Sequence, residues 1–517
     1  MSILSDRLSA EILQARQRVY TVGEPTPLQR LNLPGIQAPV YAKREDLGPI
    51  RAYKWRGAFN CMAALSQEAR DKGIVAASAG NHAQGVALAA RVLNCHATIF
   101  MPRSTPEVKQ TEVRRHGGRH VKIMLHGDCY DETAAAAHEY TETHGCTFVH
   151  PYDDLVTMAG QGTLADEVVM SGEGPFDRAY VAIGGLAASV ACWLKKFWPR
   201  IKVIGVEGID QASMKTSIEQ GRRVNLDYVD VFCDGTAVHI PGELTYPLCR
   251  ELVDEFVTVT NNEVCQAIRA MWESSRVVPE PSGAMSLAGF LKQWNRGEVK
   301  PEEKSFVVIS GANMDFTHLT QIARQAGIGN HETRYLRISM DSKRGQVLKY
   351  LRHIPQDTTL VDVQYGKTEG STQYPVFGIA ASDEDLDTIR TTLKKKGIEF
   401  EDISEDDDVR FRMIHYQPEL CQHPLFVHIE FPERAGAFLD FMERIADLAS
   451  LCYFNYTYTG ERVGRALVGM EFDTAEDRET IRKRMSAFSK NIIRSIREIS
   501  PEAFQRIMGS RQLTGNH

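Results

Sequence analysis

Short apolar runs alternate with helical patterns over residues 70–210. The runs "GIVAAS", "HATIFMP", "HVKIML" and "AYVAIGG" are rich in strand-forming residues, and apolar side chains recur at helical spacing between them. A further run, "SFVVISG", covers residues 305–311. Near-continuous apolar strands that alternate with helices are typical of a parallel sheet with helices on both faces. In such sheets ligands bind beyond the carboxyl ends of the strands, where the glycine-rich turns lie.

After about residue 332 the pattern changes to an internal repeat. "RISMDSKRGQVLKYL" begins at Arg337 and "HIEFPERAGAFLDFM" begins at His428, an offset of 91 residues. Each copy reads as strand, glycine turn, helix, two strands, helix and strand, which predicts two small α+β modules. The acidic stretch "EDISEDDDVR" between them is typical of a solvated linker. At the same offset, Gly345 matches Gly436, Leu348 matches Leu439, Tyr365 matches Tyr456 and Gly378 matches Gly469.

These patterns predict three domains. A chain of 517 residues is too long for one compact core. We expect an α/β domain over residues 1–330, followed by α+β modules over residues 334–412 and 423–505. Two small repeated modules in one chain also suggest a homo-oligomer, either a dimer or a tetramer.

Composition and charge exclude several classes of function. The net charge of −7 argues against nucleic acid as the main partner, because phosphate backbones demand basic surfaces. No apolar run approaches the roughly 18–20 residues that cross a bilayer, and the N-terminus mixes acids and bases, unlike a signal peptide. The ten cysteines include no Cys-x-x-Cys pair and no cluster at zinc spacing. We therefore predict a cytoplasmic protein with reduced thiols, no membrane partner and no metal site.

Lys54 has unusual neighbours. It stands between Tyr53 and Trp55 in "AYKWRG". Aromatic neighbours can desolvate an amine and lower its pKa, as a Schiff-base lysine requires. From spacing alone, a solvated surface charge is an equally good interpretation.

The stretch "SAGNH", residues 78–82, lies at a predicted strand-to-helix turn. Free backbone N–H groups at such a turn can bind an anion. The alternative is an ordinary helix N-cap by Ser78 or Asn81, and both can hold at once. We interpret His82 as a structural histidine rather than a base.

Two further polar residues stand next to predicted elements. Ser310 ends the apolar run "SFVVIS", where its hydroxyl could bond a ring nitrogen or simply form a turn. Glu280 precedes the predicted helix in "EPSGA", where a carboxylate would favour the helix dipole.

As an ordered set, these motifs resemble those of the pyridoxal-phosphate (PLP) dependent serine/threonine dehydratases of the tryptophan-synthase-β fold. The resemblance covers nearly all of residues 20–325. The C-terminal modules resemble the paired ACT-like, ferredoxin-like regulatory domains of biosynthetic threonine ammonia-lyases. The motifs are "KRED", "AYKWRG", "SAGNHAQG", "HPYDDLVTMAGQGT", the glycine turn, "DGTAV", "EPSGA", "SGAN", "FPERAGAFLDF" and "FNYTYTGERVGRALVGMEF".

The resemblance implies a fold, an activity and a set of site residues. The fold would be PLP fold type II, with two parallel-sheet α/β lobes, followed by the two ACT-like modules. The activity would be β-elimination of L-threonine to 2-oxobutanoate and ammonia, the first step of isoleucine biosynthesis, inhibited by isoleucine and with valine as a second candidate effector. Lys54 would bind PLP covalently and remove the α-proton. Asn81 would bond the cofactor 3-hydroxyl, and Ser310 would bond the pyridine nitrogen. The phosphate would be bound by Gly184, Gly185, Leu186 and Ala187. The substrate would be bound by Ser78, Ala79, Gly80 and His82.

The chain departs from the family pattern at the glycine turn. The family has four consecutive glycines, whereas this chain has "AIGG". Either Ala182 and Ile183 replace two of the glycines, or the loop is two residues shorter. The apolar strand "YVAI" favours the shorter loop. In addition, Ser189 stands where the family has a glycine. Four consecutive amides at a helix start would still bind phosphate. The first module lacks the "PE-x-x-G" pattern of the second, so its effector binding is the weaker expectation.

Two other function classes stay open on the sequence. One is a same-fold PLP enzyme with another outcome, such as serine dehydration, β-replacement or racemisation. The other is an amino-acid-sensing protein with a decayed active site.

Overall fold

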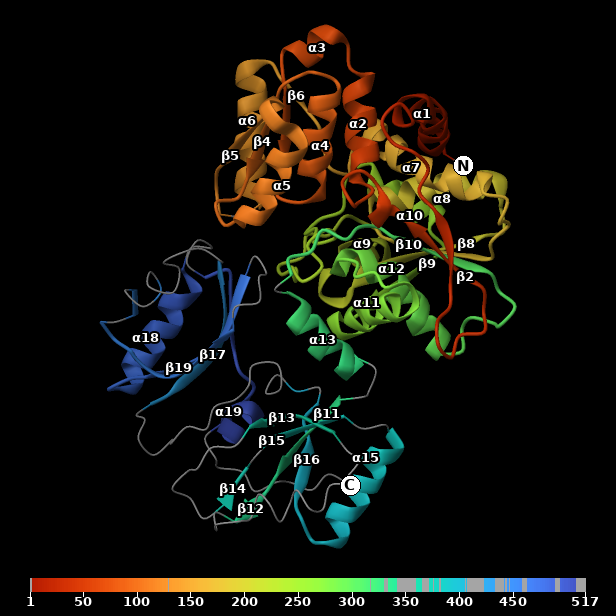
Figure 1. Cartoon of the computed structure of the whole chain (residues 1–517). Helices are drawn as coiled ribbons and strands as arrows, with labels where there is room; N and C mark the ends of the chain where they lie inside the picture. Colours follow the sequence, from red (N-terminus) through yellow and green to blue (C-terminus); the bar gives the residue numbers. More distant parts are fainter. Residues whose placement is uncertain are drawn as a thin grey trace. The chain divides into compact units, whose positions relative to one another are not determined.

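In the computed structural model the chain forms two compact units, Met1–Ala326 and Gly327–His517 (Figure 1). The structure describes residues 2–128, 130–316, 318–329, 333–341, 359–364, 372–374, 376–380, 383–404, 406, 423–432, 441, 444–445, 447–457, 463–488 and 493–507.

The first unit contains a larger sheet with strand order β1-β2-β10-β7-β8-β9. β1 is antiparallel to β2, and all the other pairs are parallel. The last strand of the unit, β10, lies between β2 and β7, so the sheet joins distant parts of the sequence. The strands are β1 (Leu28–Leu31), β2 (Val40–Arg44), β7 (Arg178–Ala182), β8 (Lys202–Gly208), β9 (Glu255–Val259) and β10 (Ser305–Ile309).

A smaller, fully parallel sheet has strand order β5-β4-β3-β6. Its strands are β3 (Ile74–Ala77), β4 (Ala97–Met101), β5 (Val121–Leu125) and β6 (Thr147–Phe148). The alternating pattern predicted a parallel sheet, and the family resemblance implied the two parallel-sheet lobes, which the two sheets of this unit confirm.

Helices cover the larger sheet on both faces. Along β10, Phe306 and Val308 pack on the side of α7 and α8, whereas Val307 and Ile309 pack on the side of α11 and α12. This alternation is the two-residue period of a strand that is buried on both faces. The helices are α1 (Ile3–Val19), α2 (Lys54–Ala64), α3 (Gln67–Asp71), α4 (Asn81–Val92), α5 (Glu107–Gly117), α6 (Tyr130–His144), α7 (Leu155–Met170), α8 (Gly185–Phe197), α9 (Ser213–Glu219), α10 (Thr245–Leu252), α11 (Asn261–Ser275), α12 (Pro281–Asn295) and α13 (His318–Gly329).

Helix α2 joins the two lobes, because it packs on α4 beside the smaller sheet and on α7 beside the larger one. The backbones of α2 and α7 approach closely, and side-chain hydrogen bonds join them. A Cβ at Gly160 would lie 2.5 Å from the carbonyl oxygen of Arg56. The amide of Gly57 donates to Gln161 Oε1 over 3.2 Å, and Asn60 Nδ2 donates to the carbonyl of Val156 over 2.7 Å. The start of α2 is therefore held closely against α7.

The second unit contains two four-stranded antiparallel sheets with equivalent strand orders, β13-β15-β11-β16 and β18-β19-β17-β20. Tyr335 pairs with Gly378 in one sheet and Phe426 pairs with Gly469 in the other. Both pairs obey the 91-residue offset, which confirms the repeat over these strands. The elements are β11 (Thr333–Ile338), β12 (Met340–Asp341), β13 (Thr359–Gln364), β14 (Thr372–Gln373), β15 (Val376–Ala380), α15 (Asp383–Lys395), β16 (Phe400–Asp402), β17 (Leu425–Pro432), β18 (Ser450–Thr457), β19 (Val463–Glu471), α18 (Ala475–Ser486), β20 (Ser495–Glu498) and α19 (Pro501–Ile507).

The acidic stretch after the first module is not a linker from its start. Glu401 and Asp402 belong to β16 and pair with Arg337 and Leu336 of β11. Several other predictions fall wholly or partly outside the described residues. These are most of the rest of the acidic stretch, the predicted first helix of the first copy, most of the predicted first helix of the second copy, and the matched pairs that begin at residues 345, 348 and 365.

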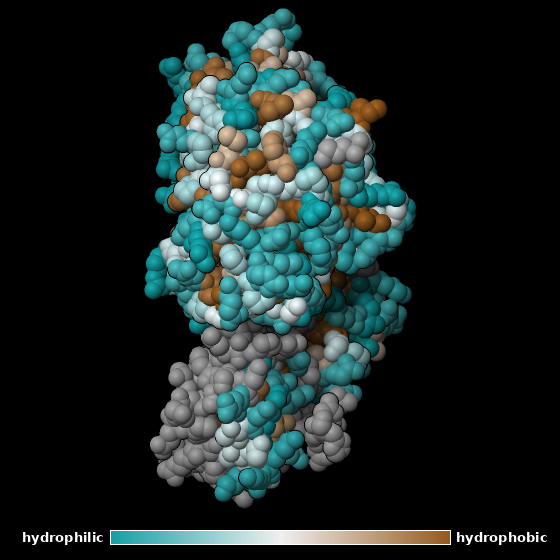
Figure 2. All heavy atoms as spheres, turned by 90° about the vertical axis from the view of Figure 1, so that its right-hand side faces the viewer, coloured by the Kyte–Doolittle hydropathy of each residue, from teal (hydrophilic) through white to brown (hydrophobic). Residues whose placement is uncertain are grey.

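The face of the molecule drawn in Figure 2 is mostly hydrophilic. Figure 2 shows apolar residues scattered singly or in small groups on a largely hydrophilic face, which is normal for a globular protein. Among the described residues, no helix combines the length and apolarity needed to span a membrane. The free thiols are Cys61, Cys95, Cys146, Cys192, Cys233, Cys249 and Cys265.

Candidate active site

Lys54 and Ser310 lie together at the carboxyl end of β10. The amide of Tyr53 donates to the carbonyl of Ser310 over 3.0 Å, and Ala52 forms a bridge with Gly311. Ser310 is 5% exposed, and its hydroxyl lies 3.4 Å from the carbonyl oxygen of Ser282. Two residues that are 256 positions apart in the chain are thus adjacent at the strand end, where ligands bind in this architecture.

The amine of Lys54 is removed from bulk water. Its Nζ donates to the carbonyl of Pro151 over 2.8 Å and lies 5.4 Å from the centre of the Tyr53 ring. Burial lowers the pKa of this amine to about 8. The predicted desolvation is confirmed, but only one of the predicted aromatic neighbours is beside the amine, because Trp55 packs towards Gly23 and Gly48 instead.

The stretch from Ser78 to His82 leads into α4 without a side-chain cap. Gly80 is the N-cap residue, and Ser78 Oγ accepts a hydrogen bond from the Gly80 amide over 3.2 Å. The alternative that Ser78 or Asn81 caps the helix is therefore wrong. The first-turn N–H groups of α4 have no side-chain acceptor of the kind that Asp154 gives α7, which suits an anion site.

His82 is held as a neutral imidazole. Its Nε2 lies 2.9 Å from the carbonyl oxygen of Val149, and burial lowers the pKa of the ring to about 3. The Nδ1 atom has no hydrogen-bond partner within the described part of the chain. These contacts favour the structural interpretation of His82; a role in substrate binding stays a prediction.

The glycine turn is a sharp entry into α8. Ala182 is the last residue of β7 and pairs with Val206, whereas Ile183 lies in the turn, where its amide donates to the Val206 carbonyl over 3.1 Å. A loop two residues shorter than the family pattern stays a prediction. Gly184, with φ of 118°, is the N-cap of α8 and has no side-chain cap. A Cβ at Gly185 would lie 2.5 Å from the carbonyl oxygen of Tyr152, so only glycine allows this close approach.

Asn81 belongs to a polar cluster that the sequence did not reveal. Its Nδ2 donates to Glu280 Oε1 over 2.6 Å, and its Oδ1 accepts from Asn313 Nδ2 over 2.7 Å. Burial raises the pKa of Glu280 to about 8. Although Glu280 is the N-cap residue of α12, its side chain makes no capping bond. The signal in the sequence was the "EPSGA" motif, which we interpreted as a dipole cap.

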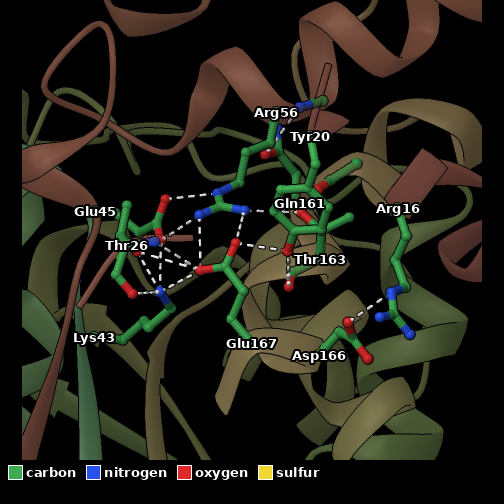
Figure 3. A network of polar contacts seen from close by, with 12 residues as sticks. Arg16, Tyr20, Thr26, Lys43, Glu45, Arg56, Gln161, Thr163, Asp166 and Glu167 are labelled. Atoms are coloured by element: carbon green, nitrogen blue, oxygen red, sulfur yellow. Dashed lines mark hydrogen bonds and ion pairs between the residues drawn. The ribbon is translucent and has the colours of Figure 1, made fainter. Parts of the chain in front are cut away.

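A buried ion network lies on the side of α2 that faces β2 and α7 (Figure 3). Arg56 donates from Nε to Glu45 Oε2 over 2.8 Å and also pairs with Glu167, which in turn pairs with Lys43. The side chains of Lys43, Glu45 and Arg56 are completely buried. Tyr20 donates to Glu167 Oε1 over 2.7 Å. The network ties the start of α2 to both neighbours.

These residues fit PLP. They offer a half-buried lysine whose amine has a lowered pKa, a serine hydroxyl at the strand end that the neighbouring Tyr53 contacts, and the uncapped N-terminus of α8 at a glycine turn, which suits a phosphate. Among the described residues no group of His, Cys, Asp and Glu could hold a metal ion.

Comparison with known proteins identifies the family. The chain belongs to the pyridoxal-phosphate dependent enzymes, whose family model matches residues 19–311, and its cofactor is PLP. Within this class it belongs to the threonine dehydratase family: the model of the C-terminal regulatory domain of threonine dehydratase matches residues 421–495. That match assigns a regulatory region, and with it a small-molecule effector, to the second unit.

Curated relatives match almost end to end. The biosynthetic L-threonine dehydratase IlvA of Haemophilus influenzae is 34% identical over 92% of this chain and 93% of its own length, and that of Escherichia coli is 33% identical over 91% and 93%. Among solved structures, the processed form of threonine deaminase isoform 2 from Solanum lycopersicum is 38% identical, with a TM-score of 0.59 over 62% of this chain and 89% of that chain. Maize serine racemase is 29% identical, with a TM-score of 0.55 over 60% and 96%.

Proposed function

We propose that this chain converts L-threonine to 2-oxobutanoate and ammonia by PLP-dependent β-elimination, as the first step of isoleucine biosynthesis. The observation that carries the proposal is the buried Lys54 amine at the end of β10, in a chain that matches biosynthetic threonine dehydratases over about nine-tenths of its length. When bound, PLP supplies the electron sink for the negative charge that develops at the substrate α-carbon.

Lys54 is proposed to hold the cofactor and to take the α-proton. A base works best when its pKa lies near the working pH, and burial lowers the pKa of the Lys54 amine to about 8. The carbonyl of Pro151, 2.8 Å from Nζ, orients the amine. Ser310 is proposed to bond the pyridine nitrogen and Asn81 the 3-hydroxyl.

Two helix N-termini are proposed to bind the anionic groups. The amides of Gly184, Gly185, Leu186 and Ala187 would take the cofactor phosphate. The turn of Ser78, Ala79 and Gly80, with the nearby His82, would take the substrate carboxylate. Neither helix has a side-chain cap, so the N–H groups of each first turn and the helix dipole are available to an anion.

The second unit is proposed to bind isoleucine, or valine as a second effector, and to inhibit the first unit. The proposed domains are residues 1–330, 334–412 and 423–505, in a cytoplasmic homo-oligomer. Reciprocal linkage requires that an effector which weakens threonine binding also binds more weakly when threonine is present.

The test is 2-oxobutanoate release from L-threonine by the purified chain with added PLP, with and without isoleucine. We expect product that isoleucine suppresses, no product from Lys54→Ala, and unchanged activity in Lys72→Ala, which loses an exposed amine paired with Glu68 at 2.9 Å. If threonine or serine is racemised and no 2-oxobutanoate is released, the activity is racemisation and not elimination. Isoleucine binding without any turnover would instead support the sensing protein.

A further inference from the structure

Three side chains from separate elements meet beside the proposed cofactor site. Asn81 begins α4 in the smaller lobe, Glu280 precedes α12, and Asn313 follows β10. Asn81 Nδ2 donates to Glu280 Oε1 over 2.6 Å, and Asn313 Nδ2 donates to Asn81 Oδ1 over 2.7 Å. Both ends of the Asn81 amide are therefore occupied by partners from the other lobe.

The Glu280 carboxylate is itself held firmly. It is 7% exposed, and its Oε2 accepts the backbone amide of Asn313 over 3.1 Å. A Cβ at position 311 would collide with the carboxylate, so Gly311 makes room for it. The side chain is thereby turned away from the N-terminus of α12, where the same carboxylate would otherwise favour the helix dipole.

These contacts determine which way the Asn81 amide faces. An amide that is turned over exchanges its NH₂ group for its oxygen. Here that exchange would place two acceptors together at Glu280 and two donors together at Asn313, so the observed orientation is the one that satisfies both partners. The NH₂ group has two N–H bonds, and Glu280 uses one of them. The second N–H remains to donate to another acceptor.

Ionisation of Glu280 strengthens this arrangement at alkaline pH. A hydrogen bond to an ionised acceptor is roughly twice as strong as one between neutral groups, and the Glu280 carboxyl, whose pKa is raised to about 8, is mostly ionised only above that pH. Burial and the nearby Asp234 raise the pKa of Glu280, whereas its bonds from Asn81 and Asn313 and the charge of Lys109 lower it. Lys109 lies 2.8 Å from Asp234, so the cluster includes a compensating cation.

We propose that Glu280 is a positioning residue that acts through Asn81: it fixes the amide so that the second N–H is presented to the ring oxygen of PLP. This inference rests on the proposed function only in taking Asn81 as a cofactor ligand. Glu280 then affects cofactor affinity and the spectrum of the bound cofactor, although it does not contact the substrate.

The experiment is a double-mutant cycle on full-length protein with Glu280→Gln, Asn81→Ala and the double variant. The measured quantities are the PLP dissociation constant, from equilibrium dialysis, and the absorption maximum of the bound cofactor. Glutamine has the shape of glutamate but brings an NH₂ group, which faces a donor at either Asn81 or Asn313. We expect Glu280→Gln to weaken PLP binding about 10-fold and to shift the absorption maximum.

The double variant separates positioning from a general structural effect. If Glu280 acts through Asn81, Glu280→Gln has no further effect in the Asn81→Ala background. Additive effects on PLP affinity would overturn the proposal, and so would an unchanged affinity and spectrum in the single variant. Glu263→Gln is the matched control, because Glu263 also accepts backbone and side-chain bonds, from Thr260 and Lys292, but belongs to the capping box at the start of α11.

Failure of the proposed function has a different signature. Wild-type protein that binds PLP with the expected dependence on Glu280 but releases no 2-oxobutanoate would refute threonine elimination and support the positioning role. Wild-type protein that binds no PLP would refute both.

Discussion

Replacing Arg56 by methionine removes the central cation of the buried ion network. Arg56 donates five hydrogen bonds, to Glu45, Glu167 and Thr163. Methionine keeps much of the length of the side chain but none of these donors. Glu45, which is completely buried, would keep the Lys43 amine at 3.5 Å and the Thr26 hydroxyl as partners.

The size of the effect follows from the burial. Breaking a buried ion pair by removing one partner costs about 3–5 kcal/mol, because the other charge stays buried without compensation. At about 2.1 cal/mol/K per residue, the unfolding entropy of the 326 residues of the first unit is roughly 0.7 kcal/mol/K. A loss of about 4 kcal/mol therefore lowers the melting temperature of that unit by about 6 °C.

The assay is thermal and urea unfolding of wild-type protein, Arg56→Met and a surface control, Lys72→Met. The control removes an exposed pair, and exposed pairs contribute about 0–1 kcal/mol. Burial alone would raise the pKa of Glu45, but the attraction of Arg56 and Lys43 outweighs it and holds that pKa below its usual value. A carboxyl with a lowered folded-state pKa stabilises above its unfolded pKa of about 4.3, and that contribution is lost as the pH falls through the folded value.

The difference between wild-type protein and Arg56→Met should therefore be largest near pH 7 and should shrink below about pH 4. The reasoning is refuted if Arg56→Met melts within a degree or so of Lys72→Met at pH 7. It is also refuted if the difference stays constant down to the acid transition.

Three other predictions concern single groups near the site. In cofactor-free protein, the neutral fraction of Lys54 should rise with pH around a midpoint near 8, so its acetylation rate, read by mass spectrometry, should rise through that midpoint and then level off; a rate that keeps rising well above the midpoint would contradict the burial argument. His82, whose pKa is lowered to about 3, should show constant ring nitrogen chemical shifts between pH 5 and 8 by NMR, and a titration in that range would show that the ring is hydrated. Gly160→Ala places a methyl group 2.5 Å from the Arg56 carbonyl oxygen and should reduce the free energy of unfolding in urea by about 1–3 kcal/mol, whereas an unchanged midpoint would mean that α2 and α7 can separate at no cost.

Local patterns were enough to predict most elements of the first unit. Runs such as "SFVVI" are apolar on both faces because both faces of β10 are buried, and that property is visible in a single segment. The pairing of β10 with β2 is different, because no local pattern says which distant strand is its neighbour. The repeat in the second unit was predictable because its two copies carry the same residues at a fixed spacing.

The candidate site likewise contains some residues that local motifs predict and others whose roles depend on distant contacts. Lys54 and the glycine turn stand in recognisable local motifs. The role of Glu280 depends on Asn81, 199 residues away, and a carboxylate before a helix favours the helix dipole in any sequence-based interpretation. The charges of "KRED" and Arg56 are ordinary surface residues on composition alone; their burial arises only when β2, α2 and α7 assemble.

The position of β10 also constrains how the chain is made. Ser305 pairs with Val40, so the two partners leave the ribosome 265 residues apart, or roughly 15–50 s at about 5–20 residues per second. From its own synthesis until β10 emerges, each of β2 and β7 has an open hydrogen-bonding edge, and open edges can pair with other chains. The larger sheet can close only when nearly all of the first unit has been synthesised. A nascent chain that stalls before residue 305 would therefore present these edges to chaperones or to its neighbours on the same messenger.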